Sequence, residues 1–224
     1  MTMLPDRFFD RDAALVAQAL LGKVIRRRWN GLWLAARIIE TEAYYLDDRG
    51  SHASLGYTHK RRALFMPGGT IYMYYARGGD SLNFSAGGEG NAVLIKSAYP
   101  WTDAQSGPDA LAAMLALNPD AQGQPRALGR LCAGQTLLCK ALALKVPDWD
   151  ARGFDAERLY VDDVGAHPPR LVQTTRLGIP TGRDEHLHYR FVDAEYAQYS
   201  TRNPLRRGQR ENVHFVWIDG AAPA

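Results

Sequence analysis

The amino-acid sequence predicts a single domain of the α+β class. Its 224 residues, 46% of them hydrophobic, are enough to form one buried core. Runs rich in β-branched and aromatic residues, which are typical of strands, mix with shorter helical segments in no regular alternation. No internal repeat and no low-complexity linker divides the chain. We therefore expect one domain over residues 1–224.

The N-terminal segment predicts a helix followed by a hairpin. Asp10 or Asp12 can cap a short helix that ends near Leu20, because aspartate side chains accept hydrogen bonds from the first helical turn. A strand is expected from residue 23 onward, and the pair Asn30 and Gly31 is a strong signal for a two-residue hairpin turn. The chain should then return as a second strand.

The run LWLAARIIETEAYY, residues 32–45, contains no breaker and predicts one long strand. Side chains alternate between the two faces of a strand, so one face should carry seven residues of this run. These are Leu32, Leu34, Ala36, Ile38, Glu40, Glu42 and Tyr44. Since that face begins apolar and ends with two carboxylates and a phenol, we expect the strand to run from the core into a cleft.

The remaining elements follow from similar patterns. Residues 46–69 are polar and rich in turn formers, which predicts a long surface loop. The glycine-rich segment 76–90 should form turns or approach a ligand closely. Strands are expected at 70–75, 91–98, 158–161, 171–179, 188–192 and 213–218, and helices at 109–117 and 135–144.

The charge pattern permits a nucleic-acid partner without requiring one. The formal net charge is only +3, and cations cluster at residues 23–28, 59–62 and 202–210. Such clusters are most often solvated surface. Because each lies in or beside a loop or strand end, a surface that faces phosphates is the alternative.

The sequence also indicates the compartment. Cys132 and Cys139 do not have the spacing of a zinc site, and we expect two buried free thiols in a reducing environment. The N-terminus lacks the apolar segment of a signal peptide, and no stretch is long enough to cross a membrane. We expect a cytoplasmic protein of bacterial type, active at the nucleoid and without a membrane partner.

Two glutamates on the long strand are the first candidates for chemistry. By composition alone, Glu40 and Glu42 are more simply explained as solvated carboxylates. Tyr44 on the same face favours the other interpretation, in which a carboxylate beside an aromatic ring acts as a general base. Tyr72 and Tyr74 share a face of the next strand, where such pairs usually pack across strands. Alternatively they form a stacking surface for a flat, electron-poor ring, and the set then suits a purine-cleaving site.

Several motifs together resemble the alkyladenine (3-methyladenine) DNA glycosylase family. They are RIIETEAYY, a histidine ten residues after Glu42, FMPGGTIYMYY, Asn83, AVLIKSA and GQTLLCKALAL, and the likeness covers about residues 14–192. The resemblance implies a compact α+β domain with a curved antiparallel sheet, a hairpin that wedges into DNA, and no metal or cofactor. It further implies a monomer that acts on double-stranded DNA containing alkylated or deaminated purines, among them 3-methyladenine, 7-methylguanine, ethenoadenine and hypoxanthine.

The resemblance also implies roles for individual residues. Glu42 would deprotonate the water that attacks C1′, with Glu40 as a supporting acid. Tyr44 and Tyr74 would hold the flipped base between their rings. His52 would hydrogen bond to the edge of the base.

Asn83 would stand where it clashes with the exocyclic amine of normal guanine. No lysine lies on the Glu42 strand face to form a Schiff base, so we expect hydrolysis without strand cleavage.

Two positions depart from the family pattern. The family usually has arginine beside the catalytic water, where this chain has Lys96, which keeps the charge but not the planar fork. Where the family has an aromatic wedge this chain has Arg77, so either Tyr75 or Arg77 would enter the DNA. Lys60 and Arg61 are the other expected DNA contacts.

These departures leave two alternatives to the glycosylase. The first is a catalytically weak or inactive nucleic-acid-binding module on the same scaffold, which Lys96 and Arg77 favour. The second is a hydrolase of free nucleosides or nucleotides, which the basic clusters weigh against.

Overall fold

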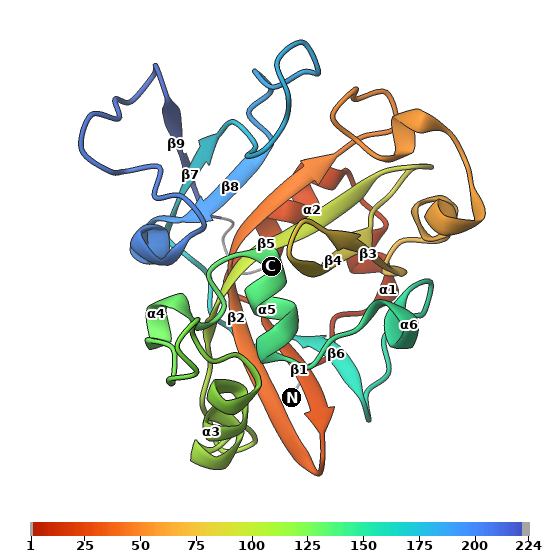
Figure 1. Ribbon diagram of the computed structural model, residues 1–224. Helices are drawn as coiled ribbons and strands as arrows, with labels where there is room; N and C mark the ends of the chain where they lie inside the picture. Colours follow the sequence, from red (N-terminus) through yellow and green to blue (C-terminus); the bar gives the residue numbers. More distant parts are fainter. Residues whose placement is uncertain (1, 221–224) are drawn as a thin grey trace.

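The computed structural model describes residues 2–220. The strands of this region are β1 (Val24–Trp29), β2 (Leu32–Tyr44), β3 (Ile71–Ala76), β4 (Gly79–Ser85), β5 (Ala92–Pro100), β6 (Leu159–Asp162), β7 (Arg170–Thr174), β8 (Arg190–Asp193) and β9 (Phe215–Asp219). They form one sheet in the order β3-β4-β5-β2-β8-β7-β9, with β1 paired to β2 and β6 paired to β1 (Figure 1). Every pair is antiparallel.

Short helices surround this sheet. The α-helices are α1 (Asp6–Phe9), α2 (Ala13–Leu20), α3 (Pro108–Leu117), α4 (Leu128–Leu131), α5 (Gln135–Ala141) and α6 (Val146–Trp149), and the 3₁₀ helices are η1 (Ala53–Leu55), η2 (His59–Phe65) and η3 (Ala194–Tyr199). Apolar side chains of α2, α3 and α5 join those of β2, β4 and β5 in the main core. The predicted α+β class is confirmed.

The N-terminal expectations are confirmed in detail. Asp12 caps α2, and its carboxylate accepts hydrogen bonds from the backbone N–H groups of the first turn. Between β1 and β2, Asn30 and Gly31 have φ angles of 47° and 83°, the left-handed conformation that a two-residue hairpin turn requires. The hairpin holds the start of β2 in register, and β2 then runs through the middle of the sheet.

A bulge near the middle of β2 changes the expected face of this strand. Ile38 pairs with Ala98 of β5, and Glu40 pairs with the next residue, Ser97. Paired residues point to the same face, whereas neighbours on a strand point to opposite faces. Ile38 and Glu40 therefore lie on opposite faces, and the expectation of one shared face from residue 32 to residue 44 is wrong.

The paired strand contains a compensating bulge. Glu40 pairs with Ser97 and Thr41 pairs with Ile95, so Lys96 is the extra residue of β5. Beyond this point Thr41 faces α2, and its hydroxyl donates to the Ala17 carbonyl. Glu40, Glu42 and Tyr44 alternate with Thr41 and thus occupy the face opposite to α2.

The glycine-rich segment after β3 forms a strand that we did not predict. In β4, Leu82 and Phe84 enter the core, while Asn83 between them faces the other side. The turn before β4 is formed by Gly78 and Gly79, which have positive φ angles of 97° and 146°. The flanking glycines obscured a regular strand pattern.

Other expectations are confirmed or corrected more simply. The surface loop 46–69 contains η1 and η2, and β7 ends at Thr174, five residues before the predicted end. Cys132 and Cys139 are buried free thiols, as expected. Within residues 2–220, no helix has the length and apolar character to span a membrane.

Candidate active site

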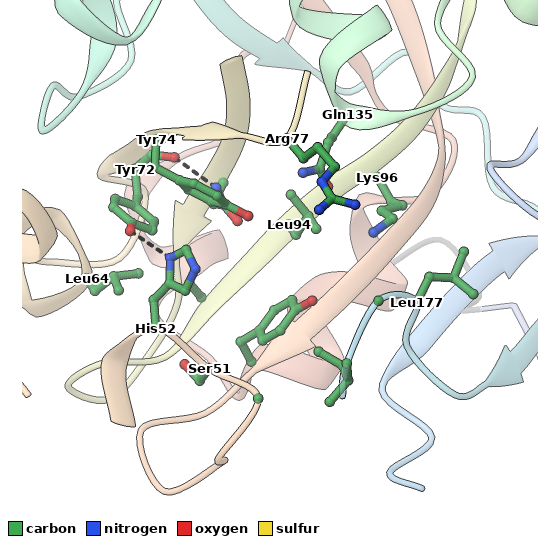
Figure 2. Close-up of a pocket in the computed structure, with 16 residues that line it drawn as sticks. Ser51, His52, Leu64, Tyr72, Tyr74, Arg77, Leu94, Lys96, Gln135 and Leu177 are labelled. Atoms are coloured by element: carbon green, nitrogen blue, oxygen red, sulfur yellow. Dashed lines mark hydrogen bonds between the residues drawn. The ribbon is translucent and has the colours of Figure 1, made fainter. Parts of the chain in front are cut away.

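A cavity of about 460 Å³ lies on the sheet face that carries the polar end of β2 (Figure 2). Its size falls in the range of small-molecule sites. It is lined by Tyr44, Gly50, Ser51, His52, Leu64, Tyr72, Tyr74, Arg77, Asn83, Ala92, Leu94, Lys96, Gln135, Leu177, Gly178 and Ile179. Seven of these residues were candidates from the sequence, and the fold brings them together from four strands and two loops: Tyr44, His52, Tyr72, Tyr74, Arg77, Asn83 and Lys96.

Glu42 lies fully buried beside this cavity and is held by three residues that line it. Its Oε2 accepts hydrogen bonds from the Tyr44 hydroxyl at 2.7 Å and from Lys96 Nζ at 3.4 Å. Its Oε1 accepts from the backbone N–H of Leu177 at 2.9 Å. Burial, with a smaller effect of the Glu42 charge, raises the pKa of Tyr44 well above its ordinary value of 10.0. Tyr44 therefore stays protonated and donates to the carboxylate.

Glu40 has a different environment, although it lies on the same face. It is fully buried, and its Oε1 accepts a hydrogen bond from Arg190 Nε at 2.6 Å. Its Oε2 accepts from the Ser97 hydroxyl and from the backbone N–H of Thr201, each at 2.7 Å. Glu40 does not line the cavity. Its contacts connect β2 to β5, to β8 and to the C-terminal segment.

Aromatic rings form one side of the cavity. Tyr72 and Tyr74 stack with ring centres 5.5 Å apart, and the His52 ring meets Tyr74 edge-on at 4.5 Å. His52 Nδ1 lies 3.0 Å from the Tyr72 hydroxyl. Figure 2 shows these three rings on one side and Lys96 with Leu177 on the other. A flat ring can enter between the two sides.

Arg176 packs against the Tyr44 ring, although no sequence pattern indicated a role for this arginine. Its guanidinium lies 4.6 Å from the centre of the Tyr44 ring, pairs with Asp48 and donates to the Ala43 carbonyl. The arginine is buried, and the next residue is Leu177, which bonds to Glu42. One loop after β7 therefore fixes both the tyrosine ring and the carboxylate.

The His52 imidazole is expected to remain neutral at pH 6.5. Partial burial of the ring, followed by the charges of Arg61 and Arg183, lowers the pKa of His52 from its ordinary value of 6.5. A base with a lowered pKa takes up its proton only at a lower pH than the free side chain. Following the histidine side-chain NMR signals during a pH titration tests this, with His52→Gln to assign the signal. A His52 midpoint at or above pH 6.5 would contradict it.

Asn83 also faces the cavity. It lies opposite Tyr72 in the β3–β4 pair, is buried, and its Nδ2 donates to the Tyr72 carbonyl at 3.1 Å. This bond fixes the orientation of the amide, with its nitrogen toward the Tyr72 carbonyl.

The four predicted DNA contacts lie in different places. Arg77 is exposed at the β3–β4 turn and lines the cavity. Tyr75 is also exposed, at 69%, but it points to the strand face opposite to Tyr74 and does not line the cavity. Lys60 is exposed on η2. Arg61 instead donates to the carbonyls of Leu55 and Gly56 and supports its own loop.

Across residues 2–220, no group of three or more histidine, cysteine, aspartate or glutamate side chains is arranged to hold a metal ion.

Comparison with known proteins points to one family. The sequence model of methylpurine-DNA glycosylase (MPG) matches residues 7–197. A protein of Pseudomonas aeruginosa (strain LESB58) is 73% identical over 206 residues, which cover 92% of this chain and 86% of the relative. A protein of Pseudomonas savastanoi pv. phaseolicola is 70% identical over 216 residues, covering 96% of this chain and 97% of the relative. The names of both relatives contain the words 3-methyladenine DNA glycosylase.

Proposed function

Because the chain belongs to the methylpurine-DNA glycosylase family, we propose that it hydrolyses the N-glycosidic bond of damaged purines in double-stranded DNA. The observation that carries the proposal is the position of Glu42. Its carboxylate is held by three hydrogen-bond donors at the border of a cavity with stacked tyrosines. The substrates we propose are 3-methyladenine, 7-methylguanine, ethenoadenine and hypoxanthine.

Recognition begins when the damaged nucleotide leaves the duplex. A glycosidic bond inside the stack is out of reach, and a damaged base unstacks at lower cost than a normal one. Tyr44 and Tyr74 would contact the two faces of the base, with His52 at its edge. Since rings with positive charge bind aromatic faces more strongly than neutral rings do, this arrangement favours purines alkylated at N3 or N7.

Glu42 activates water in this proposal. A carboxylate has about four acceptor positions, of which Tyr44 and Lys96 use two on Oε2 and Leu177 uses one on Oε1. The remaining position on Oε1 accepts the proton of the attacking water. The water oxygen then bonds to C1′ as the bond from C1′ to the purine nitrogen breaks. A purine alkylated at N3 or N7 leaves as a neutral base, so no strong general acid is needed. Ethenoadenine and hypoxanthine must take up a proton as they leave, which the attacking water supplies overall. In both cases the carboxylate stabilises the sugar cation.

The reaction stops at the abasic site in this proposal. We expected hydrolysis without strand cleavage because no lysine lies on the Glu42 face of β2. The neighbouring strand β5 nevertheless places Lys96 Nζ 3.4 Å from Glu42 Oε2. Because Lys96 Nζ is bonded to the carboxylate that activates the water, we expect this amine not to attack C1′. Treatment with borohydride during turnover should therefore trap no covalent complex between protein and DNA.

Lys96→Met is expected to lower the single-turnover rate of base release about 10–100-fold. The reason is that a hydrogen bond to a charged group contributes about 1.5–3 kcal/mol, and each 1.4 kcal/mol changes a rate about tenfold. Lys96→Arg is the control, because it keeps the charge beside Oε2 and should release base faster than the methionine variant. Release by Lys96→Met at the wild-type rate would exclude a role for this cation.

Arg77 is the better candidate for the residue that enters the DNA. It extends from the turn that borders the cavity, so it can fill the space left by the flipped base, while Tyr75 alternates to the other face. Asn83 would exclude normal guanine through contact with its exocyclic amine.

The function is tested with duplexes that each contain one of the four proposed lesions. Alkali converts abasic sites into strand breaks, which report base release. We expect release from lesion duplexes and none from the free nucleosides. Release from nucleosides alone would indicate a small-molecule hydrolase. Binding of lesion duplexes without any release would indicate a nucleic-acid-binding module.

A further inference from the structure

We propose that a second, basic pocket next to the active site binds a phosphate of the DNA backbone beside the flipped nucleotide. The inference rests on the proposed function for the identity of its ligand. The pocket has a volume of about 270 Å³ and lies between β7, β8 and the segment 202–214. Its cationic lining consists of Arg190, Arg202 and Arg206, with His188 and His214 beside them.

The charge of this pocket is not neutralised by its own lining. None of the lining residues is an aspartate or a glutamate. Arg190 forms an ion pair with Glu40, but within residues 2–220 neither Arg202 nor Arg206 has an ion-pair partner. Two guanidinium groups at one concave, acid-free surface suit a phosphodiester, because their N–H donors match phosphate oxygens in pairs.

Buried contacts hold the backbone of this segment in place. Arg190 Nη2 donates to the Arg202 carbonyl at 2.6 Å, and the N–H of Thr201 donates to Glu40 at 2.7 Å. On the opposite wall, the Thr174 hydroxyl donates to the His214 carbonyl at 2.7 Å. The backbone of the pocket is therefore held in place before any ligand binds, which lowers the entropic cost of binding.

The position of the pocket points to DNA. Leu177 lines both cavities, and its N–H is the donor to Glu42 Oε1. A nucleotide whose base enters the first cavity carries a phosphate on each side of its sugar. Because Leu177 borders both cavities, a phosphate of the flipped strand can reach the second while the base occupies the first.

The cationic segment lies outside the part of the chain that the family sequence model matches. That match ends at residue 197, whereas the alignment with the Pseudomonas savastanoi protein includes 216 of the 224 residues. At most eight residues remain outside that alignment, so it reaches past Arg206. Arg202 and Arg206 thus lie beyond the matched range, whereas Arg190 and His188 of the same pocket lie within it.

The test compares two double variants of equal charge. Arg202→Ala/Arg206→Ala removes the two pocket arginines that have no ion-pair partner within residues 2–220. Arg207→Ala/Arg210→Ala removes two exposed arginines of the same segment that do not line the pocket. Affinity for a lesion duplex is measured over a range of salt concentrations. We expect the pocket variant to bind about tenfold more weakly or worse, with the salt slope reduced by about 1, and the control to match wild type. Single-turnover base release at saturating protein should be unchanged in the control variant Arg207→Ala/Arg210→Ala.

Neutral methylphosphonates at single positions near the lesion identify the phosphate. One of these substitutions should weaken DNA binding by the wild type. The same substitution should not weaken DNA binding by the pocket variant any further. An equal loss of DNA affinity in both double variants would overturn the proposal, because it would indicate a general electrostatic attraction of the whole segment to DNA. Binding of inorganic phosphate by the pocket with unchanged DNA affinity of the pocket variant would overturn it as well. If wild type shows the pocket-dependent DNA binding but releases no base, the proposed function fails while the phosphate site stands.

Discussion

Glu42→Gln is expected to lower the single-turnover rate of base release about 10²–10⁴-fold, the usual contribution of a positioned general base. Glutamine has nearly the same shape, and its amide oxygen can still accept from Leu177 N–H or from the Tyr44 hydroxyl. It cannot take a proton from water or carry the charge that stabilises the sugar cation. The rate is measured with a duplex that contains one 7-methylguanine, with alkali to reveal abasic sites.

Two controls separate loss of chemistry from loss of structure. Affinity for the lesion duplex should stay within a few-fold of wild type, because Glu42 lies behind the residues that line the cavity. Tyr44→Phe keeps the ring and removes one donor to Oε2, so its rate should fall between those of wild type and Glu42→Gln. Equal release by wild type and Glu42→Gln would show that another group activates the water.

The local patterns of the sequence were enough to predict much of this site. Alternation places Glu40, Glu42 and Tyr44 on one face, and the structure has them there. Alternation could not show the bulge between Ile38 and Glu40, because a bulge is a property of the pairing between strands and not of one strand. The polar end of β2 therefore lies on the face opposite to the one that the apolar residues before the bulge suggested.

Contacts across long separations were beyond the reach of sequence patterns. The N–H of Leu177 bonds to Glu42 from 135 positions away along the chain, and a backbone donor leaves no trace in the residue type. Arg176 looked like any other arginine in a strand-like run, although it stacks on Tyr44 and pairs with Asp48. The C-terminal cations were noted only as a cluster, since nothing local tells a pocket from a solvated surface.

Glu40→Ala is expected to destabilise the fold by about 3–5 kcal/mol. Removing one partner of a buried ion pair leaves the other charge without compensation in a medium of low polarity. Glu40 and Arg190 are both fully or almost fully buried, and the variant would also leave the Ser97 hydroxyl and the Thr201 N–H without their acceptor. Urea unfolding of wild type and variant, followed by far-UV circular dichroism, gives the difference in unfolding free energy.

An exposed pair provides the matched control for this measurement. Arg28 and Glu157 lie 3.5 Å apart with side chains 50% and 81% exposed, so Glu157→Ala should change stability by less than about 1 kcal/mol. Replacing both buried partners, in Glu40→Gln/Arg190→Met, should recover part of the loss, because no unpaired charge is then left inside. If Glu40→Ala instead keeps wild-type stability but loses base release, then Glu40 takes part in the chemistry. The separation of the two glutamates into a structural and a catalytic carboxylate would then be wrong.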